Sequence, residues 1–115
     1  MEITRQNKGP RMSQIVQYGD TVYLAGQVSD KPEGDTSVQT RDVLSKIERL
    51  LQQAGSSKSK ILATTIYLAD MRDFAAMNEA WDSWVDPDNT PARATVEAKL
   101  ARPNLRVEMM VIAAR

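Results

Sequence analysis

Hydrophobic and polar positions alternate along much of this chain, and in two places the alternation changes to a helical spacing. Strand-like runs cover residues 2–6, 13–18, 22–28, 61–69, 93–100 and 106–114. Apolar side chains recur every three or four positions from about residue 37 to 54, and again from about 74 to 84, which predicts two amphipathic helices. The order β-β-β-α-β-α-β-β predicts an α+β domain with two helices on one face of a sheet.

Local signals place the boundaries of these elements. Gly9 and Pro10 predict a turn between the first two strands, and the polar segment 29–36 predicts a loop. Gly55 is expected to end the first helix and Pro87 the second. The run 61–69 is apolar on both faces, as in an interior strand.

The last predicted strand carries one acidic residue among apolar neighbours. Glu108 shares a face with Met110 and Ile112. Desolvation of a carboxylate on such a face is unfavourable unless the group is paired with a cation, hydrogen-bonded or open to solvent. One interpretation is structural: a solvated strand end, or an ion pair with Arg93, Arg102 or Arg106. The other is a carboxylate that activates water beside a substrate-binding arginine. If the final two strands form an antiparallel hairpin, Arg93 and Glu108 lie near the same end of the sheet.

Other candidates each have a structural alternative. Asn78 could be a hydrogen-bonded core amide or a tether for a loop. Trp81 and Trp84 are expected in the core or at a subunit contact rather than as a ligand platform. Gly26 could be needed for the local backbone conformation, or it could allow a ligand to approach the backbone closely.

Composition narrows the chemistry. With 115 residues, the chain is expected to form one domain, 1–115, with little room for an enclosed pocket. It has no cysteine and no histidine, which excludes disulfides, thiolate catalysis, cysteine-bound metal clusters and a Ser-His-Asp triad. Its 15 basic and 15 acidic side chains cancel, which argues against nucleic acid and anionic membranes as partners. There is no long apolar segment at the start and no nucleotide-binding glycine motif, so we expect a cytoplasmic protein without a nucleotide cofactor.

Seven short motifs, in order and at near-constant spacing over nearly the whole chain, resemble those of the reactive intermediate deaminase family (RidA/YjgF). They are Ala25-Gly26-Gln27, Gln39-Thr40, Ala54-Gly55, the run 65–71 (TIYLADM), the run 73–78 (DFAAMN), Pro91-Ala92-Arg93 and Val107-Glu108. The resemblance implies a chorismate-mutase-like fold, a mixed sheet backed by two helices, assembled as a homotrimer with three clefts between subunits. It also implies hydrolysis of short-lived 2-imino or enamine acids, released by pyridoxal-phosphate enzymes or amino-acid oxidases, to 2-keto acids and ammonia without metal or cofactor.

The same resemblance assigns site residues. Arg93 matches the family arginine that binds the substrate carboxylate as a bidentate fork, and Glu108 matches the glutamate that activates water. Backbone groups around Thr95 and Gly26 would complete the site, and Asn78 is counted with the substrate-binding residues.

Two positions depart from the family pattern. Met12 stands where the archetypal deaminases carry a tyrosine, and Ala25 replaces the serine before Gly-Gln. The loss of two hydroxyls predicts a more apolar pocket that prefers imines with larger apolar side chains. Two other functions stay open: a non-catalytic trimer that binds or senses small 2-keto acids through Arg93, and an RNA-directed role, against which the zero net charge weighs.

Overall fold

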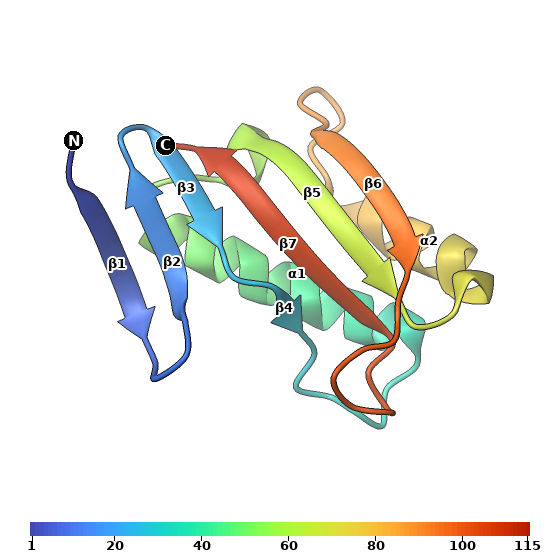
Figure 1. The fold of residues 1–115 in the computed structure, drawn as a ribbon. Coiled ribbons are helices and arrows are strands. Elements are labelled where there is room, and N and C mark those ends of the chain that lie inside the picture. Colours follow the sequence, from blue (N-terminus) through green and yellow to red (C-terminus); the bar gives the residue numbers. More distant parts are fainter.

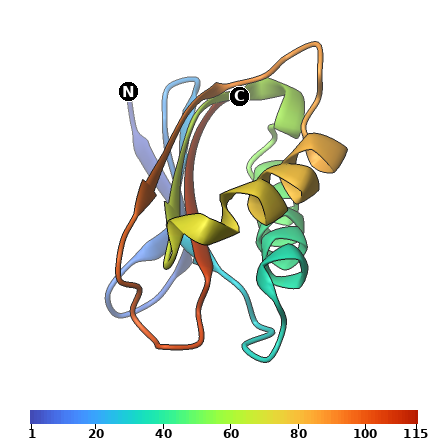
Figure 2. The same cartoon turned by 90° about the vertical axis from the view of Figure 1, so that its right-hand side faces the viewer.

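The computed structural model describes all residues, 1–115, and shows a sheet with two helices on one face (Figures 1 and 2). The strands are β1 (Ile3–Lys8), β2 (Ser13–Tyr18), β3 (Thr21–Leu24), β4 (Gln27–Val28), β5 (Ile61–Leu68), β6 (Ala92–Glu97) and β7 (Val107–Ala114). The helices are α1 (Thr36–Gln53) and α2 (Phe74–Trp84), with short 3-10 turns η1 (Lys58–Lys60) and η2 (Met71–Asp73). The predicted α+β class and both helices are confirmed. No helix combines the length and apolar character that a membrane crossing requires.

The seven strands form one mixed sheet in the order β1-β2-β3-β7-β5-β6, and β4 also pairs with β7. Only β5 and β6 run parallel; the other pairs are antiparallel. The C-terminal strand therefore lies in the middle of the sheet, and β6 lies at its edge (Figure 1).

The expected hairpin between the last two strands is wrong. β5 lies between them, since it pairs with β6 on one side and with β7 on the other. A parallel neighbour requires a long crossover, which α2 provides between β5 and β6. Residues 98–106 then cross the end of β5, so that β7 pairs with the edge of β5 opposite to β6 (Figure 1).

Two predicted strands differ in length from the observed ones. The run 93–100 stops at Glu97 because β5 ends at Leu68, whose carbonyl accepts a last hydrogen bond from the Ala98 N–H (2.9 Å). The run 22–28 is divided into β3 and β4. β3 and β4 both pair with β7, but Tyr23 is opposite Ile112 while Gln27 is opposite Met109. One extra residue is thus accommodated at Ala25 and Gly26, as in a β-bulge.

The core lies between the sheet and the helices. α1 begins at the N-cap Asp35, whose carboxylate accepts from the Val38 N–H (2.9 Å), and Gly55 follows its end with a φ of 79°, in the left-handed region that favours glycine. Its buried stripe meets alternate residues of the central strands. The cluster includes Val43, Leu44, Ile47, Leu51, Ile66, Leu68, Met77, Trp81, Val107, Met109 and Val111. Burial of this stripe provides most of the drive for folding.

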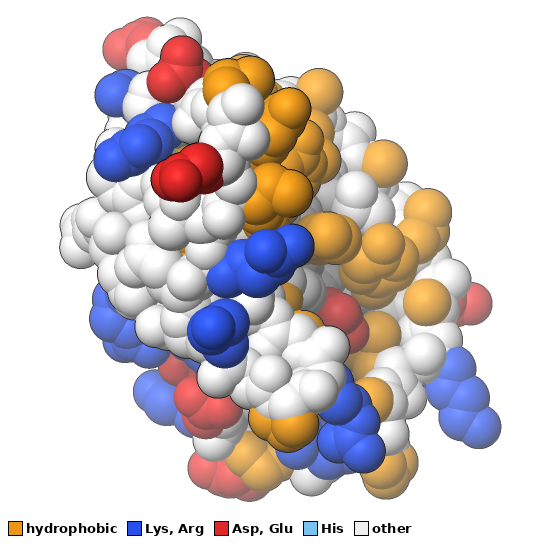
Figure 3. All heavy atoms as spheres, turned by 60° about the vertical axis from the view of Figure 1, so that its left-hand side comes forward, with side chains coloured by type: hydrophobic (Ala, Val, Ile, Leu, Met, Phe, Trp, Pro, Cys, Tyr) orange, Lys and Arg blue, Asp and Glu red, His pale blue; other side chains and the backbone are white.

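The other face of the sheet is uncovered and largely apolar. Ile3, Tyr18, Tyr23, Val96 and Met110 are each exposed to solvent by 40% or more. Figure 3 shows hydrophobic side chains gathered over this face. An apolar area of this kind on an isolated chain is typical of a surface that another protein chain covers.

Candidate functional site

Arg93 projects from the edge strand β6 toward the helix layer. It is paired with Thr64 of β5, and directly paired residues point to the same face of a sheet. Thr64 is buried with Ile66 and Leu68 on the core face, so the Arg93 side chain emerges on the same side as α2.

The guanidinium of Arg93 lies over the indole ring of Trp81, with 5.3 Å between Cζ and the ring centroid. It forms none of the three ion pairs and no side-chain hydrogen bond with the protein. Its N–H groups are therefore free for an external carboxylate, which fits the bidentate geometry of a guanidinium.

Two hydroxyls without hydrogen-bond partners lie next to this arginine in the sheet. Thr95, two residues along β6, and Thr64, in the adjacent strand, both have a buried Oγ1 that bonds to no protein group. Buried polar atoms are normally satisfied, so two unsatisfied ones beside a free guanidinium favour a place for a polar ligand or its water. Thr95 was a predicted site residue; Thr64 was not.

Asn78 lies on α2, one helical turn before Trp81. It is half-buried and its amide forms no hydrogen bond with another residue. Neither the hydrogen-bonded core amide nor the loop tether is observed, and the side chain lies on the same helix as Trp81, which contacts Arg93.

Glu108 projects to the opposite face of the sheet. Val107 and Met109, its neighbours along β7, are buried on the core face, so Glu108 points to the uncovered face. Its partner in β5 is Tyr67, which lies on the same face, and its partner in β4 is Val28. The half-buried carboxylate is thus bordered by an aromatic ring, an aliphatic side chain and backbone.

Gly26 is required where the Glu108 carboxylate packs. A Cβ on Gly26 would collide with Oε2 of Glu108 and lie 3.2 Å from its Cδ. The bulge that presents Gly26 is fixed by Gln27, whose buried amide nitrogen donates to the Ala25 carbonyl (3.0 Å) and to Gln14 Oε1 (2.8 Å). Gly26 and Glu108, two of the candidate residues, therefore lie in contact, whereas Thr95 lies on the other face of the sheet.

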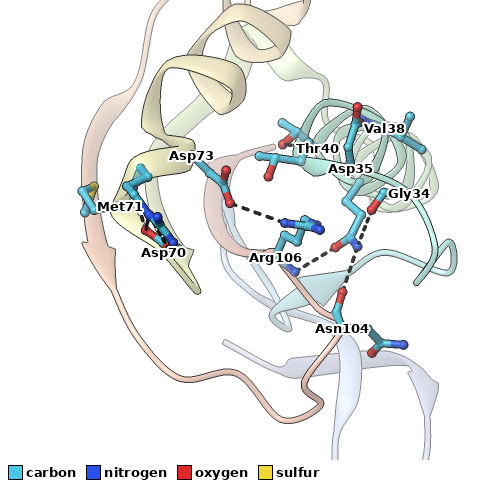
Figure 4. A network of polar contacts seen from close by, with 12 residues as sticks. Gly34, Asp35, Val38, Thr40, Asp70, Met71, Asp73, Asn104 and Arg106 are labelled. Carbon is cyan, nitrogen blue, oxygen red and sulfur yellow. Dashed lines mark hydrogen bonds and ion pairs between the residues drawn. The ribbon is translucent and has the colours of Figure 1, made fainter.

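A buried amide holds the start of β7 in place (Figure 4). The side chain of Gln39, fully buried on α1, donates to the carbonyls of Gly34 (3.1 Å) and Asn104 (3.0 Å) and accepts from the N–H of Arg106 (2.9 Å). This network lies two residues before Glu108 and fixes the strand that carries it.

The predicted structural role of Glu108 as an ion-pair partner is not observed. Arg106 instead points toward Asp73, 3.9 Å away, as Figure 4 shows. Neither Arg93 nor Glu108 has a side-chain partner of opposite charge within this chain. Both charges remain available to a ligand.

The two positions that depart from the family pattern lie at the same end of the sheet as Glu108. The N–H of Ala25 donates to the Gln14 carbonyl (3.0 Å), which brings the β1–β2 turn with Met12 close to the bulge. Met12 is exposed by 54%. Ala25 directly precedes Gly26, which lies against the carboxylate, and Met12 lies in the turn two residues before Gln14.

The candidate residues form two groups on opposite faces of one sheet. The arginine half consists of Arg93, Thr95, Thr64 and Trp81; the glutamate half consists of Glu108, Gly26 and Tyr67. Because β5 separates the two strands and the side chains point in opposite directions, the halves of one chain cannot contact one small substrate. The arginine half can bind a carboxylate, and the glutamate half can hold and deprotonate a water.

Sequence reasoning missed three members of these groups. Trp81 was interpreted as a core residue, and it is buried in the core, but its ring also supports Arg93. Thr64 and Tyr67 lie in a run interpreted as an interior strand, and Tyr67 also belongs to the motif 65–71, but neither residue was given a role in the site. Thr64 is paired with Arg93 and Tyr67 with Glu108, and this pairing between strands is what places them at the site. The alternation of residues within one strand does not show which residues of another strand lie opposite.

The largest hollow of the chain lies elsewhere. It encloses about 750 Å³ beside residues 97–103, in the loop after β6, and none of the predicted site residues lines it. The structure brings no group of three acidic side chains together as a metal site. Neither half of the candidate site is an enclosed cavity in one chain.

Comparison with known proteins gives the family. The model described as Endoribonuclease L-PSP matches residues 6–115. A RutC family protein of Haemophilus influenzae is 46% identical over 114 residues, 98% of each chain, and the RutC family protein YoaB of Escherichia coli is 43% identical over 114 residues, 99% of each chain. The crystal structure of NMB1025 from Neisseria meningitidis, a member of the YjgF family, superposes with a TM-score of 0.96 at 45% identity, covering 100% of this chain and 96% of that one. With the fold and the two halves of the site already in place, the chain belongs to the YjgF/RidA/L-PSP family.

Proposed function

We propose that this protein is a cytoplasmic 2-imino acid hydrolase that acts as a homotrimer and needs no metal or cofactor. The observation that carries the proposal is the placement of Arg93 and Glu108, both without partners of opposite charge, on opposite faces of one sheet. The chain belongs to the YjgF/RidA/L-PSP family, and the deaminase activity that the resemblance to this family implies supports the reaction class.

Assembly of several copies would complete the site. In a ring of identical copies, the same two surfaces meet at every interface, so the arginine half of one copy can face the glutamate half of the next. The uncovered apolar face, which carries Glu108 and Met110, supports burial against a neighbour. The lack of an enclosed cavity around either half is consistent with a cleft between copies.

Arg93 would bind and orient the substrate. A 2-imino acid carries a planar carboxylate next to the C=N carbon, and a guanidinium binds such a group through two parallel N–H bonds. Binding at two points fixes the direction of the adjacent carbon, which reduces the entropy that the reaction must still lose. The unpartnered hydroxyl of Thr95 would donate to the same carboxylate or to the imine nitrogen.

Glu108 would act on the water. Its carboxylate takes a proton from a water as the oxygen attacks the imine carbon, and the proton is then delivered to the nitrogen. The resulting carbinolamine loses ammonia and leaves the 2-keto acid, so one imino acid and one water give one keto acid and one ammonia. Gly26 allows the carboxylate to lie against the bulge, in a fixed position beside Val28 and Tyr67.

Met12 and Ala25 suggest which imines fit. Their side chains lack the hydroxyls found at these positions in the archetypal deaminases, so small hydroxyl-dependent contacts are lost. We propose a preference for 2-imino acids with larger apolar side chains, such as those derived from leucine or methionine, over the imine derived from alanine.

The proposal is tested with imino acids that an amino-acid oxidase produces in the assay mixture. Semicarbazide traps the imino acid as a measurable adduct and competes with the protein for it. Wild-type protein should lower the trapped signal as its concentration rises. Arg93→Ala should remove this effect, and Arg49→Ala, which changes an exposed arginine on α1, should not. Glu108→Gln should retain carboxylate binding and lose hydrolysis; full activity in that variant would remove the glutamate from the mechanism.

The assay also separates the alternatives. Failure of the wild type to compete for any imine, together with Arg93-dependent binding of a 2-keto acid, would favour a non-catalytic binding protein. Binding and cleavage of single-stranded RNA at low salt would favour the role that the name of the family model suggests.

A further inference from the structure

The best-defined contact of the candidate site is the cation–π contact between Arg93 and Trp81. The Cζ atom lies 5.3 Å from the centroid of the indole, and no other group of the protein holds the guanidinium. Arg93 is exposed and lies on an edge strand, so without this contact the side chain would sample many rotamers.

Trp81 is itself rigidly held. Only 6% of its surface is exposed, and it belongs to the core cluster. Its ring lies 5.7 Å from that of Trp84 at an angle of 51°, and the Trp84 indole N–H donates to Glu48 of α1 (2.9 Å). Burial in the core therefore holds the indole that faces Arg93, and the hydrogen bond of Trp84 to α1 is not needed for this.

This geometry leaves the useful part of the guanidinium free. A cation–π contact places the positive charge over the aromatic ring and does not require the N–H donors to bond to a protein acceptor. Because no side chain or backbone acceptor of the protein bonds to the Arg93 guanidinium, its N–H donors remain available for a planar carboxylate.

We propose that Trp81 is a positioning residue that orders the Arg93 guanidinium for carboxylate binding. The inference rests on the proposed role of Arg93 in carboxylate binding, not on the hydrolysis step. It predicts that Trp81 controls affinity for carboxylate ligands, whereas the rate of the chemical step depends on the glutamate half.

The test compares three variants with the wild type. Trp81→Leu removes the aromatic face, Trp81→Phe retains one, and Trp84→Phe is the matched control that changes the neighbouring ring without touching Arg93. The readouts are the Kd for 2-oxobutyrate, followed by NMR, and KM and kcat for imine hydrolysis. Far-ultraviolet circular dichroism and gel filtration confirm that each variant is folded and assembled.

Trp81→Leu should raise Kd and KM about tenfold and change kcat by less than about threefold, because the cation–π contact orders the arginine that binds the carboxylate and does not involve the water or the glutamate. Trp81→Phe should recover most of the affinity, and Trp84→Phe should leave it unchanged. If Trp81→Leu does not fold, the smaller loss expected for Trp81→Phe, relative to Trp84→Phe, remains measurable.

A second readout monitors the arginine without a ligand. The Arg93 Nε–Hε signal, assigned by its absence in Arg93→Lys, should shift upfield from the indole ring current and show restricted motion. Both features should be lost in Trp81→Leu.

Three results would overturn the inference. Unchanged Kd and KM in folded Trp81→Leu would do so while leaving the proposed function intact. Equal losses in Trp84→Phe would show a general packing effect. Failure of the wild type to bind any 2-keto acid or hydrolyse any imine would refute the proposed function, and the role of Trp81 with it.

Discussion

Two inactive variants should restore activity when their subunits mix. Arg93→Ala removes the arginine half of the site and Glu108→Gln disables the glutamate half. If each site takes its arginine from one copy and its glutamate from the next, a mixed ring contains some interfaces at which both wild-type residues meet. The opposite faces of Arg93 and Glu108 in the sheet make this the expected arrangement.

The expected activity of the mixture follows from the fraction of interfaces that contain both wild-type residues. With equal amounts of the two variants and random assembly, a copy that retains Arg93 is present with a probability of about one half, and the neighbour retains Glu108 with the same probability. About one quarter of all sites should then be complete, giving about 25% of the wild-type activity from two preparations that are each inactive. A site built within one chain would give no recovery, since no single chain carries both residues.

The assay uses co-expression of the two variants with different tags. Tandem affinity purification isolates mixed assemblies, native mass spectrometry reports their composition, and imine hydrolysis is measured per subunit. Tandem purification removes the unmixed trimers, which have no complete site, and each mixed trimer has one complete site of three. Recovery of about one third of the wild-type activity in the purified mixed trimers therefore supports a site shared between copies. Mixed assemblies with no activity above that of the separate variants would refute the reasoning, because exchange would have occurred without complementation.

Three further predictions concern single side chains. Gly26→Ala forces a carboxylate oxygen to move by about 1 Å and should lower kcat about 100-fold with little change in Tm, whereas Gly9→Ala, whose Cβ would meet only ordinary contacts, should change neither. Gln39→Ala leaves two carbonyls and one N–H unpaired in a buried network and should lower the free energy of unfolding by about 3 kcal/mol, measured by urea titration. Hydrogen bonds from Arg72 lower the pKa of Asp70 to about 2 from an ordinary 3.8, so its contribution to stability is present above pH 4 and lost as the pH falls toward 2; Tm should therefore decline less steeply over that range in Asp70→Asn.

The helices were predictable because their signal is local. Val43, Ile47 and Leu51 repeat at helical spacing, and each is buried against the sheet. Gly55 follows the end of α1 with a positive φ, as its place in the sequence indicated. These features depend only on residues within a few positions of one another.

The order of the strands was not predictable in the same way. Alternation in residues 93–97 and 107–114 identifies two strands but does not reveal which strand lies beside which. If β6 and β7 had paired directly, as sequence neighbours often do, Arg93 and Glu108 would lie close together in one chain. Because β5 lies between the two strands, the two residues are separated. The contact between Arg93 and Trp81 was missed for the same reason, since it joins an edge strand to a helix across the layer.

The division of the site between two faces follows from the register of a single strand. Thr64 of β5 is opposite Arg93 and Tyr67 is opposite Glu108, and residues three apart on a strand point to opposite faces. A shift of one residue in either pairing would bring both charges to the same face.

For β7, that shift would also move Met109 and the other core residues of the strand out to solvent, so burial of apolar side chains selects the observed register. The hydrophobic core that stabilises each copy therefore also determines that its arginine and glutamate cannot serve one substrate. Activity of this family member is thereby expected to depend on assembly, even though neither charged group contributes to the core.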